Sequence, residues 1–479
     1  MSVLAQPADQ SPPSDQSPAI DRSQAVDRSQ AVDRSQAVDR SQAVDRSSPA
    51  ESPHDHRRLG RDLDIFTSDE LAGAGFPLWL PNGAAIVAEL ERYIVEVERR
   101  SGYQHVRTPP VGKRELYERS GHWQHFGPDM FPPMPLGRGD NDADADADAD
   151  AKAGRDELVL RPVLCPHHAL VFRSRLRSHR ELPLRIGEVG PQFRMERSGV
   201  VSGLTRVRGM ILNDAHVFCP LDRAAEEVAA VLQMIDQAYD VLGIQAAYHS
   251  LSLRGPAEAG KSYAGSEEMW RQAEVVLRQA LDLRGVEYRE QPGEAAFYGP
   301  KIDVQVYDAQ GREFTLSTVQ VDLYQPERFD LEYVAPDGSR QRPVIVHRSV
   351  LASMERMVAY LLEAYGGALP AWLSPLQVRV LPVGPDERDA ARKVAQLGLE
   401  AGLRVDVDDR DESLGARVRN AQLRKVPYVA VVGAREAAGE SVAVRLRDGQ
   451  QAGVVAVERF VSGVRHAVES RTSDLTLPK

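Results

Sequence analysis

Residues 185–219 read RIGEVGPQFRMERSGVVSGLTRVRGMILNDAHVFC, two apolar runs separated by a segment rich in arginine, serine and glycine. The first run, Arg185–Val189, is typical of a β-strand, and Arg194 follows it where the chain enters a Ser-Gly turn. We place Arg206 and Arg208 on the returning strand. Planar guanidinium groups suit bidentate contacts to phosphate, while ordinary surface arginines are the alternative interpretation for each one taken singly.

The segments around this stretch alternate between strand-like and helix-like patterns that come in blocks. Such blocks favour an antiparallel sheet with helices packed on it, an α+β domain. The helical periodicity is clearest in the first helix, where apolar residues recur every three or four positions. The expected strands are Leu158–Val163, Arg185–Val189 and Lys301–Tyr307, and the expected helices are Ala84–Arg100, Ala224–Leu242 and Glu267–Leu283.

After Gly367 the pattern changes, and Pro370, Trp372 and Pro375 mark a junction. Strands and helices then alternate one by one, which predicts a small α/β domain with a mostly parallel sheet. The expected order is strand Gln377–Leu381, helix Asp386–Ala401, strand Val405–Asp408, helix Leu414–Leu423, strand Tyr428–Val432 and helix Val457–Glu469.

Two segments of low complexity interrupt the globular pattern. Residues 1–53 contain the unit Ser-Gln-Ala-Val-Asp-Arg in tandem from Ser23 to Arg46, with too little apolar surface to offset chain entropy. We predict a disordered tail there, with a docking peptide as the alternative. A second disordered segment, an acidic insert at about 132–157, is predicted from the Asp-Ala alternation between Asp140 and Ala151, with metal binding by the aspartates as its alternative.

The composition of the 479 residues allows two or three domains and a sizeable buried core. The net charge of -11 argues against a generally basic nucleic-acid binder but leaves room for a local basic face that binds tRNA. The two cysteines, Cys165 and Cys219, make a disulfide framework improbable and favour the cytoplasm. No apolar run is long enough for a membrane span, and the N-terminus does not resemble a secretory signal.

Three residues form a candidate metal set. Cys165, His216 and His347 each follow or end an apolar strand-like segment, so all three could point into one cleft. One thiolate and two imidazoles suit zinc, and three protein ligands leave a fourth position open for a substrate. Because these residues are far apart in the chain, three ordinary core or surface residues are the alternative interpretation.

The ordered motifs resemble the class II aminoacyl-tRNA synthetases. The helix 84–100 followed by Val106–Pro109 resembles motif 1, the segment Phe193–Gly209 resembles motif 2, and the segment His347–Arg356 resembles motif 3. The threonyl type of this class is indicated by Ser120–Trp123, Cys165-Pro166, Asp214–His216, Ala296–Lys301 and Arg348–Arg356. The resemblance covers about residues 54–470 and implies a catalytic domain at 54–368, an anticodon-binding domain at 374–470 and a tail at 471–479.

The resemblance also implies roles for residues of the catalytic domain. Cys165, His216 and His347 would hold a zinc ion that binds the amino and hydroxyl groups of threonine, and Mg²⁺ would accompany ATP. Valine offers no hydroxyl and would be rejected. The remaining roles are Asp214 for the threonine hydroxyl, Tyr298 for the amino end, Arg194 for the α-phosphate, Arg356 for the γ-phosphate, Glu196 for the adenine edge, Arg206 for ATP, Lys301 and Gln320 for the reacting carboxylate, and His122 for proton removal from the tRNA 2′-hydroxyl. A structural histidine beside Trp123 is the alternative for His122.

In the last domain, Arg419, Glu436 and Arg445 fall where the family contacts anticodon bases. Motif 1 forms the dimer interface in this class, so the resemblance implies a homodimer. The chain has no room for the family's N-terminal editing domain, so we expect serine to be mischarged and a possible editing factor to act in trans.

Several positions depart from the family pattern near the substrate. Leu212 replaces a glutamine that contacts the substrate in the family, Leu164 replaces an asparagine, and Phe314–Ser317 replaces a Trp-Gln-Cys-Gly run. His167 and Ala352 replace glycines, and Asp411 replaces an asparagine that is linked to anticodon binding. These departures put ordinary threonine affinity in doubt more than the fold.

Three functions are therefore weighed. The first is an ATP-dependent threonine–tRNA ligase. The second is a synthetase paralogue for antibiotic self-resistance or specialised metabolism, which activates threonine or an analogue and loads another carrier. The third is a non-catalytic synthetase-like regulator, against which the intact Arg194, Glu196, Arg356 and zinc ligands argue.

Overall fold

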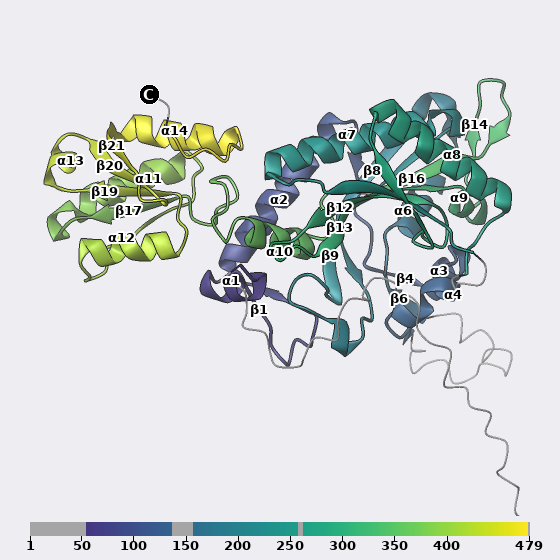
Figure 1. Cartoon of the computed structure of the whole chain (residues 1–479), viewed down its shortest axis with the longest axis horizontal. Coiled ribbons are helices and arrows are strands. Elements are labelled where there is room, and N and C mark those ends of the chain that lie inside the picture. The colour runs from purple at the N-terminus through teal and green to yellow at the C-terminus, as the bar shows by residue number, and fades with distance from the viewer. Residues whose placement is uncertain (1–53, 137–156, 257–261, 478–479) are drawn as a thin grey trace, which may run out of the picture. The chain divides into compact units, whose positions relative to one another are not determined.

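The computed structural model describes residues 54–136, 157–256 and 262–477 (Figure 1). The predicted N-terminal tail and almost all of the acidic insert lie outside these residues. The centre of the catalytic part is an eight-stranded sheet of order β11-β10-β12-β13-β16-β9-β8-β3. Its strands are β3 (Gln104–His105), β8 (Leu184–Phe193), β9 (Gly209–Cys219), β10 (Tyr248–Leu253), β11 (Tyr288–Pro292), β12 (Lys301–Tyr307), β13 (Glu313–Asp322) and β16 (Val344–Ser349).

The middle of this sheet is antiparallel, which confirms the predicted α+β architecture. The six strands from β10 to β8 pair antiparallel, and only the edge pairs β10–β11 and β3–β8 are parallel. The predicted strand 301–307 coincides with β12, while β8 extends beyond the predicted strand 185–189 at both ends. β8 is longer because its pairing with β9 runs without a break from Leu184 to Phe193.

Side chains alternate between the two faces of the central strands. Val217 on β9, Val304 on β12 and Val319 on β13 belong to one apolar core, against which helices α7 (Ala224–Leu242) and α8 (Glu267–Arg284) pack. Because successive residues of a strand point to opposite faces, His216 and Gln320 lie on the other face. The sheet therefore presents one apolar face to α7 and α8 and one polar face to the candidate site.

The long helices agree with the predicted ones. α7 matches its predicted bounds, and α8 ends one residue later than predicted. Helix α2 (Pro81–Arg100) begins three residues before the predicted start, because Pro81 occupies its first turn, where a missing N–H costs nothing. Helix α10 (Met354–Ala364) follows β16 and is capped by Ser353, whose side chain accepts a hydrogen bond from the Arg356 N–H.

Shorter elements complete the catalytic part. They are α1 (His56–Asp62), β1 (Phe66–Thr67), β2 (Leu78–Trp79), β4 (Val111–Lys113), α3 (Arg114–Arg119), α4 (His122–Phe126), β5 (Met134–Pro135), β6 (Glu157–Leu160), α6 (Cys165–Arg173), β7 (Arg177–Ser178), α9 (Tyr324–Arg328), β14 (Tyr333–Val334) and β15 (Arg340–Gln341). The predicted strand 158–163 corresponds to β6, which ends earlier, because the next residue, Arg161, donates in register to the carbonyl of Pro110, which has no N–H to donate in return.

The prediction that Arg206 and Arg208 lie on the returning strand was wrong, since β9 begins only at Gly209. The Arg208 carbonyl still accepts a hydrogen bond from the Arg194 N–H at 2.9 Å, next to the last β8–β9 pair, but its own N–H donates to the Gly75 carbonyl at 2.8 Å, so the regular strand ends here. Arg206 closes a tight turn, in which the Ser202 N–H donates to the Arg206 carbonyl at 3.1 Å. Both arginines therefore belong to the loop between β8 and β9.

The C-terminal domain has a five-stranded sheet of order β18-β17-β19-β20-β21. Strands β17 (Val378–Pro382), β18 (Val405–Val407) and β19 (Tyr428–Val432) are parallel, as expected. The sequence patterns did not predict the antiparallel strands β20 (Ser441–Leu446) and β21 (Gln451–Ala456), so the sheet is mixed instead of mostly parallel. These two strands form a hairpin whose turn contains Gly449, at φ +92°.

Four helices accompany this second sheet: α11 (Arg388–Glu400), α12 (Leu414–Leu423), α13 (Ala434–Ala438) and α14 (Val457–Glu469). α12 and α14 match their predicted bounds, whereas the first residues of the predicted helix 386–401 belong to a short 3-10 turn, Pro385–Glu387. Among the described residues, no helix has the length and apolar character needed to cross a membrane.

Candidate functional site

The polar face of the central sheet carries one row of chemically active side chains. His216 on β9 pairs directly with His347 on β16, His347 pairs with Gln320 on β13, and Gln320 pairs with Lys301 on β12. Residues directly opposite each other in a ladder point to the same face, so the four side chains lie side by side. The register of three ladders thus joins residues that are up to 131 positions apart in the chain.

Cys165 joins this row from helix α6, where it is the first residue and Pro166 the second. The ligand atoms of Cys165, His216 and His347 all lie within 4.8 Å of one another. The three residues are 3%, 1% and 5% exposed, so the predicted set converges in a buried cluster. Two imidazoles and one thiol at this spacing fit the ligand set of a tetrahedral zinc site with one open position.

The hydrogen bonds around the cluster hold each imidazole by one nitrogen. His168 Nδ1 lies 2.8 Å from His216 Nδ1, and Asp322 Oδ2 lies 2.9 Å from His347 Nε2. His216 Nε2 and His347 Nδ1 are therefore the ring atoms that remain for a metal. Outer contacts of this kind orient metal-binding histidines and select their tautomers.

Further hydrogen bonds hold His168 and Asp322, the residues that contact the two imidazoles. Glu188 Oε2 lies 3.3 Å from His168 Nε2, and Arg161 donates to the other oxygen of Glu188 at 3.1 Å. The Gln325 amide donates both to Asp322 at 2.8 Å and to the Cys165 sulfur at 3.6 Å. The residues present thus fit a bound zinc ion in donor type and in tautomer.

Burial dominates the electrostatics of the cluster. Desolvation raises the pKa of the Cys165 thiol, and the nearby Asp214 raises it further. Desolvation, followed by the neighbouring His347 and His168, lowers the pKa of His216. Neutral imidazoles are the form that binds metals, and a bound cation would favour the thiolate that burial disfavours.

Four further predicted residues line the space next to the cluster. Tyr298 donates a hydrogen bond to the side-chain oxygen of Gln320, and its ring centroid lies 5.0 Å from that of His347. Asp214 lies two residues before His216 on β9 and accepts a 3.4 Å hydrogen bond from Gln192. His122 Nε2 lies 3.8 Å from the Cys165 sulfur. Tyr298, Gln320, Asp214 and His122 thus gather at one end of the site.

A cleft of about 990 Å³ contains the other predicted residues. It is bordered by the β8–β9 loop, by β12 and β13, and by the start of α10. The predicted residues in its wall are Arg194, Glu196, Arg206, Lys301, Gln320 and Arg356. Gln320 therefore joins the buried cluster to this cleft, since it lines the cleft and also pairs with His347.

Cationic groups crowd this cleft. Desolvation lowers the pKa of Arg356, and the nearby Arg194 and Arg206 lower it further. Desolvation also lowers the pKa of Arg194. Glu196 offsets part of this charge through an ion pair with Arg206 at 2.9 Å. An anion with several charges would relieve the repulsion, so the cleft suits a polyphosphate.

Some of the departures from the family pattern lie in the wall of the same cleft, and the others lie elsewhere. Leu212 and Ala352 line it together with residues 315–317 of the replaced run. Ser317 donates to the Val350 carbonyl at 2.5 Å, so its hydroxyl is turned into the fold. Leu164 is the buried N-cap of α6, His167 is buried beside the Val111 carbonyl, and Asp411 is exposed. Leu212, Ala352 and the run 315–317 can thus change the shape of the cleft.

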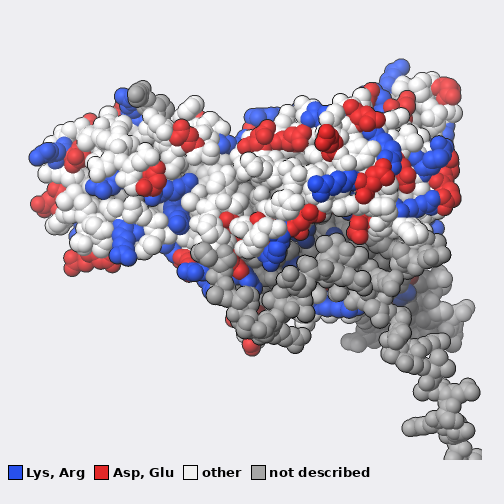
Figure 2. Space-filling model, viewed as in Figure 1, with Lys and Arg blue, Asp and Glu red and all other residues white. Residues whose placement is uncertain are grey.

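The structure does not bring the predicted anticodon residues together in one contact. Arg419 lies exposed on α12, Arg445 lies on β20, and Glu436 accepts a hydrogen bond from the Gly433 N–H at the start of α13. No hydrogen bond or ion pair joins the three within the described part of the domain. Figure 2 shows basic and acidic side chains interspersed on the visible face, so tRNA contacts there would be local.

Sequence reasoning missed the residues that hold the ligands in place. His168 lies three positions after Cys165 on α6, and Asp322 lies two positions after Gln320 on β13. Helical spacing of three and strand spacing of two each return a side chain to the same face, so these signals were present. Glu188 had no such signal, because only the β8–β9 register places it near His168.

Comparisons with known proteins match both domains of the chain. Residues 149–365 match the model of the tRNA synthetase class II core domain (G, H, P, S and T), and residues 377–466 match that of the anticodon binding domain. Threonine–tRNA ligase from Geobacillus sp. (strain WCH70) is 47% identical over 415 residues, which are 86% of this chain and 62% of that protein. Threonine–tRNA ligase 1 from Bacillus subtilis (strain 168) is 47% identical over 408 residues, 85% of this chain and 61% of that protein.

Solved structures are similar as well. The crystal structure of the RNA binding domain of threonyl-tRNA synthetase from Cryptosporidium parvum Iowa II superposes with a TM-score of 0.78 at 32% identity. The match covers 89% of this chain and 99% of that one. Prolyl-tRNA synthetase from Giardia lamblia, at 18% identity and a TM-score of 0.65, shares the fold. The chain spans about 62% of the length of the curated relatives, and it belongs to the threonyl-tRNA synthetase family of the class II aminoacyl-tRNA synthetases.

Proposed function

We propose that this chain activates L-threonine with ATP and transfers the threonyl group to threonine tRNA. In the first step a carboxylate oxygen of threonine attacks the α-phosphorus of ATP, and pyrophosphate leaves as threonyl-adenylate forms. In the second step a ribose hydroxyl of the terminal tRNA nucleotide attacks the adenylate carbonyl, and AMP leaves. The observation that carries this proposal is the ladder register that joins the Cys165–His216–His347 cluster to a cleft lined by arginines.

The amino-acid end of the site selects an amino alcohol. A zinc ion held by Cys165, His216 and His347 would supply a Lewis acid that binds the amino and hydroxyl groups of threonine. Asp214 accepts the hydroxyl proton in a hydrogen bond, and the Tyr298–Gln320 pair lies at the amino and carboxylate end. Valine would leave these polar groups without partners, which is costly in a buried site.

The cleft binds ATP, with Mg²⁺ as the expected companion of its phosphates. Arg194 is assigned to the α-phosphate, where charge develops during attack, and Arg356 to the γ-phosphate. Arg206 and Glu196 form the ion pair at the nucleotide end. Lys301, which is paired with Asp303, lines the cleft beside Gln320 and is assigned to the reacting carboxylate.

His122 is assigned either to proton removal in the second step or to structural support. Burial, followed by the neighbouring His347, lowers the pKa of His122 to about 3, which makes it a weak base. Its Nδ1 lies 2.8 Å from the Ser120 hydroxyl, and the residue is 1% exposed. These contacts favour the structural role, in which His122 packs beside Cys165.

We further propose a homodimer, contacts of Arg419, Glu436 and Arg445 with the anticodon, and action in the cytoplasm. Serine carries the same amino and hydroxyl groups as threonine, so the site itself would activate serine detectably. We expect a separate factor to hydrolyse threonine tRNA that has been mischarged with serine.

Amino-acid-dependent exchange of pyrophosphate into ATP, followed by charging of threonine tRNA, tests the proposal. We expect exchange with threonine, weaker exchange with serine and none with valine, and then charging of the tRNA. Exchange without charging would favour the paralogue that loads another carrier, and no exchange with any amino acid would favour the regulator. Discrimination of threonine over serine by more than about 10⁴ would contradict the binding mode described here.

A further inference from the structure

A second buried cluster of ionisable side chains lies outside the residues used above. Asp55, His56 and Glu363 have ligand atoms within 4.8 Å of one another, and none is more than 9% exposed. Arg57 already pairs with Asp55, donating from Nε at 3.0 Å and from Nη2 at 2.5 Å, and these hydrogen bonds lower the pKa of Asp55 to about 2. A guanidinium in this position occupies the carboxylate, so the cluster is not built for a metal ion.

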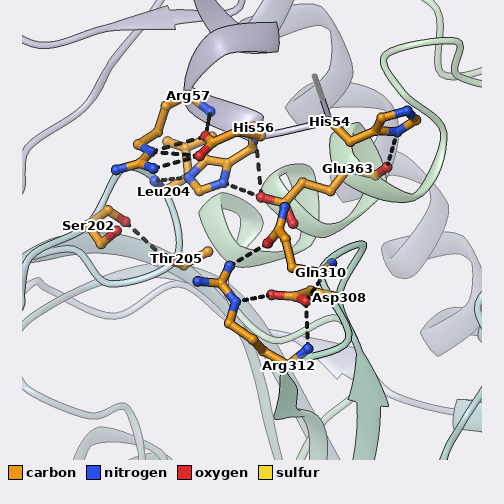
Figure 3. A network of polar contacts seen from close by, with 11 residues as sticks. His54, His56, Arg57, Ser202, Leu204, Thr205, Asp308, Gln310, Arg312 and Glu363 are labelled. Atoms are coloured by element: carbon orange, nitrogen blue, oxygen red, sulfur yellow. Dashed lines mark hydrogen bonds and ion pairs between the residues drawn. The ribbon is translucent and has the colours of Figure 1, made fainter. Parts of the chain in front are cut away.

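The partners of His56 define its role (Figure 3). Its Nδ1 lies 2.7 Å from Glu363 Oε1, and its Nε2 accepts a hydrogen bond from the Leu204 N–H at 3.2 Å. Because Nε2 is an acceptor, the proton resides on Nδ1 and is donated to Glu363. The imidazole therefore bridges the end of helix α10 and one backbone amide of the β8–β9 loop.

The loop segment that His56 contacts is a tight turn. The Thr205 and Arg206 N–H groups both donate to the Ser202 carbonyl, at 3.0 and 3.2 Å. Gly203 approaches His56 so closely that a Cβ at this position would lie 2.3 Å from Nε2, and its φ is +46°. The turn is thus shaped against the imidazole ring, and a glycine is required at the point of closest approach.

Helix α10 reaches the same turn from its other end. The Arg356 guanidinium donates to the Thr205 carbonyl at 3.5 Å, while Glu363 reaches Leu204 through His56. Arg206, the next residue of the turn, carries the ion pair with Glu196 in the cleft. Two consecutive residues of the turn are therefore tied to the two ends of one helix.

We propose that His56 is a positioning residue for ATP: it holds the turn 202–206 so that Arg206 and the Thr205 carbonyl bound by Arg356 keep their places in the cleft. This inference rests on the proposed function, since it assigns the cleft to ATP. It predicts an effect on the KM for ATP and none on the binding of the amino acid, whose site lies on the polar face of the sheet.

Two substitutions separate the bonds of the imidazole. In His56→Asn the amide nitrogen can replace Nδ1 and donate to Glu363, but nothing reaches Leu204. In His56→Gln the amide oxygen can replace Nε2 and accept from the Leu204 N–H. We expect His56→Asn to raise the KM for ATP about tenfold in the exchange assay, with the KM for threonine changed less than twofold, and His56→Gln to stay within about threefold of the wild type.

Hydrogen exchange provides a second readout that needs no activity. The peptide containing Leu204 should exchange at least tenfold faster in His56→Asn than in the wild type, and His56→Gln should restore protection. His179→Asn is the matched control, because the His179 imidazole likewise contacts one backbone group, the Val334 carbonyl, outside the cleft. This variant should leave both the KM for ATP and the rate of hydrogen exchange in the turn 202–206 unchanged.

Gly203→Ala disturbs the same contact from the other side and should also raise the KM for ATP. It serves as the test if His56→Asn does not fold. Equal KM values for ATP in His56→Asn and His56→Gln would overturn the proposal. So would wild-type rates of hydrogen exchange in the turn in both His56→Asn and Gly203→Ala. A wild type that exchanges no pyrophosphate would contradict the proposed function, while the hydrogen-exchange comparison would still test the contact.

Discussion

At the scale of single residues, the two cysteines of the chain differ in what surrounds them. Cys165 lies with His216 and His347, whereas Cys219 packs in the apolar core beneath α7 with Val217. Desolvation raises the pKa of both thiols, so burial alone does not distinguish them. The neighbouring imidazoles make Cys165 a candidate ligand for the proposed zinc ion, and the apolar neighbours make Cys219 a small hydrophobic residue.

These surroundings predict which cysteine is needed for zinc. Cys165→Ala should reduce bound zinc from about one ion per chain to less than a tenth, because two imidazoles alone hold the ion weakly. Cys219→Ala is the matched control and should retain the full zinc content. Metal analysis of the purified proteins by mass spectrometry makes the comparison, and equal zinc in both variants would contradict the assignment.

Glu355 is a buried carboxyl at the start of α10, and it accepts hydrogen bonds from the Ile211 N–H at 3.1 and 3.3 Å. Desolvation raises its pKa from the ordinary 4.5 to about 7. The folded state therefore binds a proton more tightly than the unfolded state does. The contribution of Glu355 to stability is present below pH 4.5 and is lost as the pH rises through 7.

Replacing the Glu355 carboxyl with an amide should reduce the dependence of the unfolding free energy on pH. Between pH 5 and 8 the wild type should lose up to about 3 kcal/mol of unfolding free energy relative to Glu355→Gln. Denaturant unfolding of both proteins at the two pH values measures this difference. If the wild type gains unfolding free energy relative to Glu355→Gln between pH 5 and 8, or if the difference in unfolding free energy does not change with pH, Glu355 is not the titrating group.

At the scale of secondary-structure elements, the turn from β16 into α10 contains Ala352 in the left-handed region, at φ +52°. Its carbonyl accepts a hydrogen bond from the Asn213 N–H at 3.2 Å, which ties β9 to this turn. A residue with a Cβ is destabilised by roughly 1 kcal/mol in this backbone conformation, which glycine adopts freely. The backbone geometry explains why the family pattern has glycine here.

Ala352→Gly should therefore raise the unfolding free energy by roughly 0.5–1 kcal/mol, net of the entropy that glycine loses on folding. Ala359→Gly is the matched control, because Ala359 is buried in the interior of α10, where glycine costs about 1 kcal/mol. Thermal unfolding should shift upward for the first variant and downward for the second. Two shifts of the same sign would contradict the argument from backbone strain.

At the scale of the whole molecule, the motif 1 helix α2 follows a segment with two exposed leucines. Leu71 is 99% exposed and Leu78 is 43% exposed, and both shortly precede the helix that resembles motif 1. A second subunit that covers this region is consistent with the homodimer implied by the class.

We expect light scattering to give twice the chain mass of 52.8 kDa at micromolar concentration. Leu71→Asp should shift the protein toward the monomer, and Leu283→Asp, at an exposed leucine on α8, serves as the control that should leave the mass unchanged. A wild type that remains monomeric at these concentrations would rule out the dimer.

The helices α7 and α14 match their predicted bounds, because their 3.6-residue pattern of apolar side chains continues to both ends. β12, the continuous apolar run of β19 and the less regular helix α12 match their predicted bounds as well. The hairpin of β20 and β21 was missed, although β20 alternates between half-buried and buried residues, and the mostly exposed residues of β21 show no apolar alternation. The three residues of the candidate metal set were predicted through motifs, because their spacing along the chain carries little information, and the structure brings them together.

The sequence by itself determined the α+β class and the motifs that contain Cys165, His216 and His347, since periodicity and motifs are properties of neighbouring residues. Only the tertiary structure decided that His168 and Asp322 orient the imidazoles and that His56 contacts Leu204. Such contacts join residues from 25 to 148 positions apart, and their distances depend on strand register and helix packing, which no local pattern encodes.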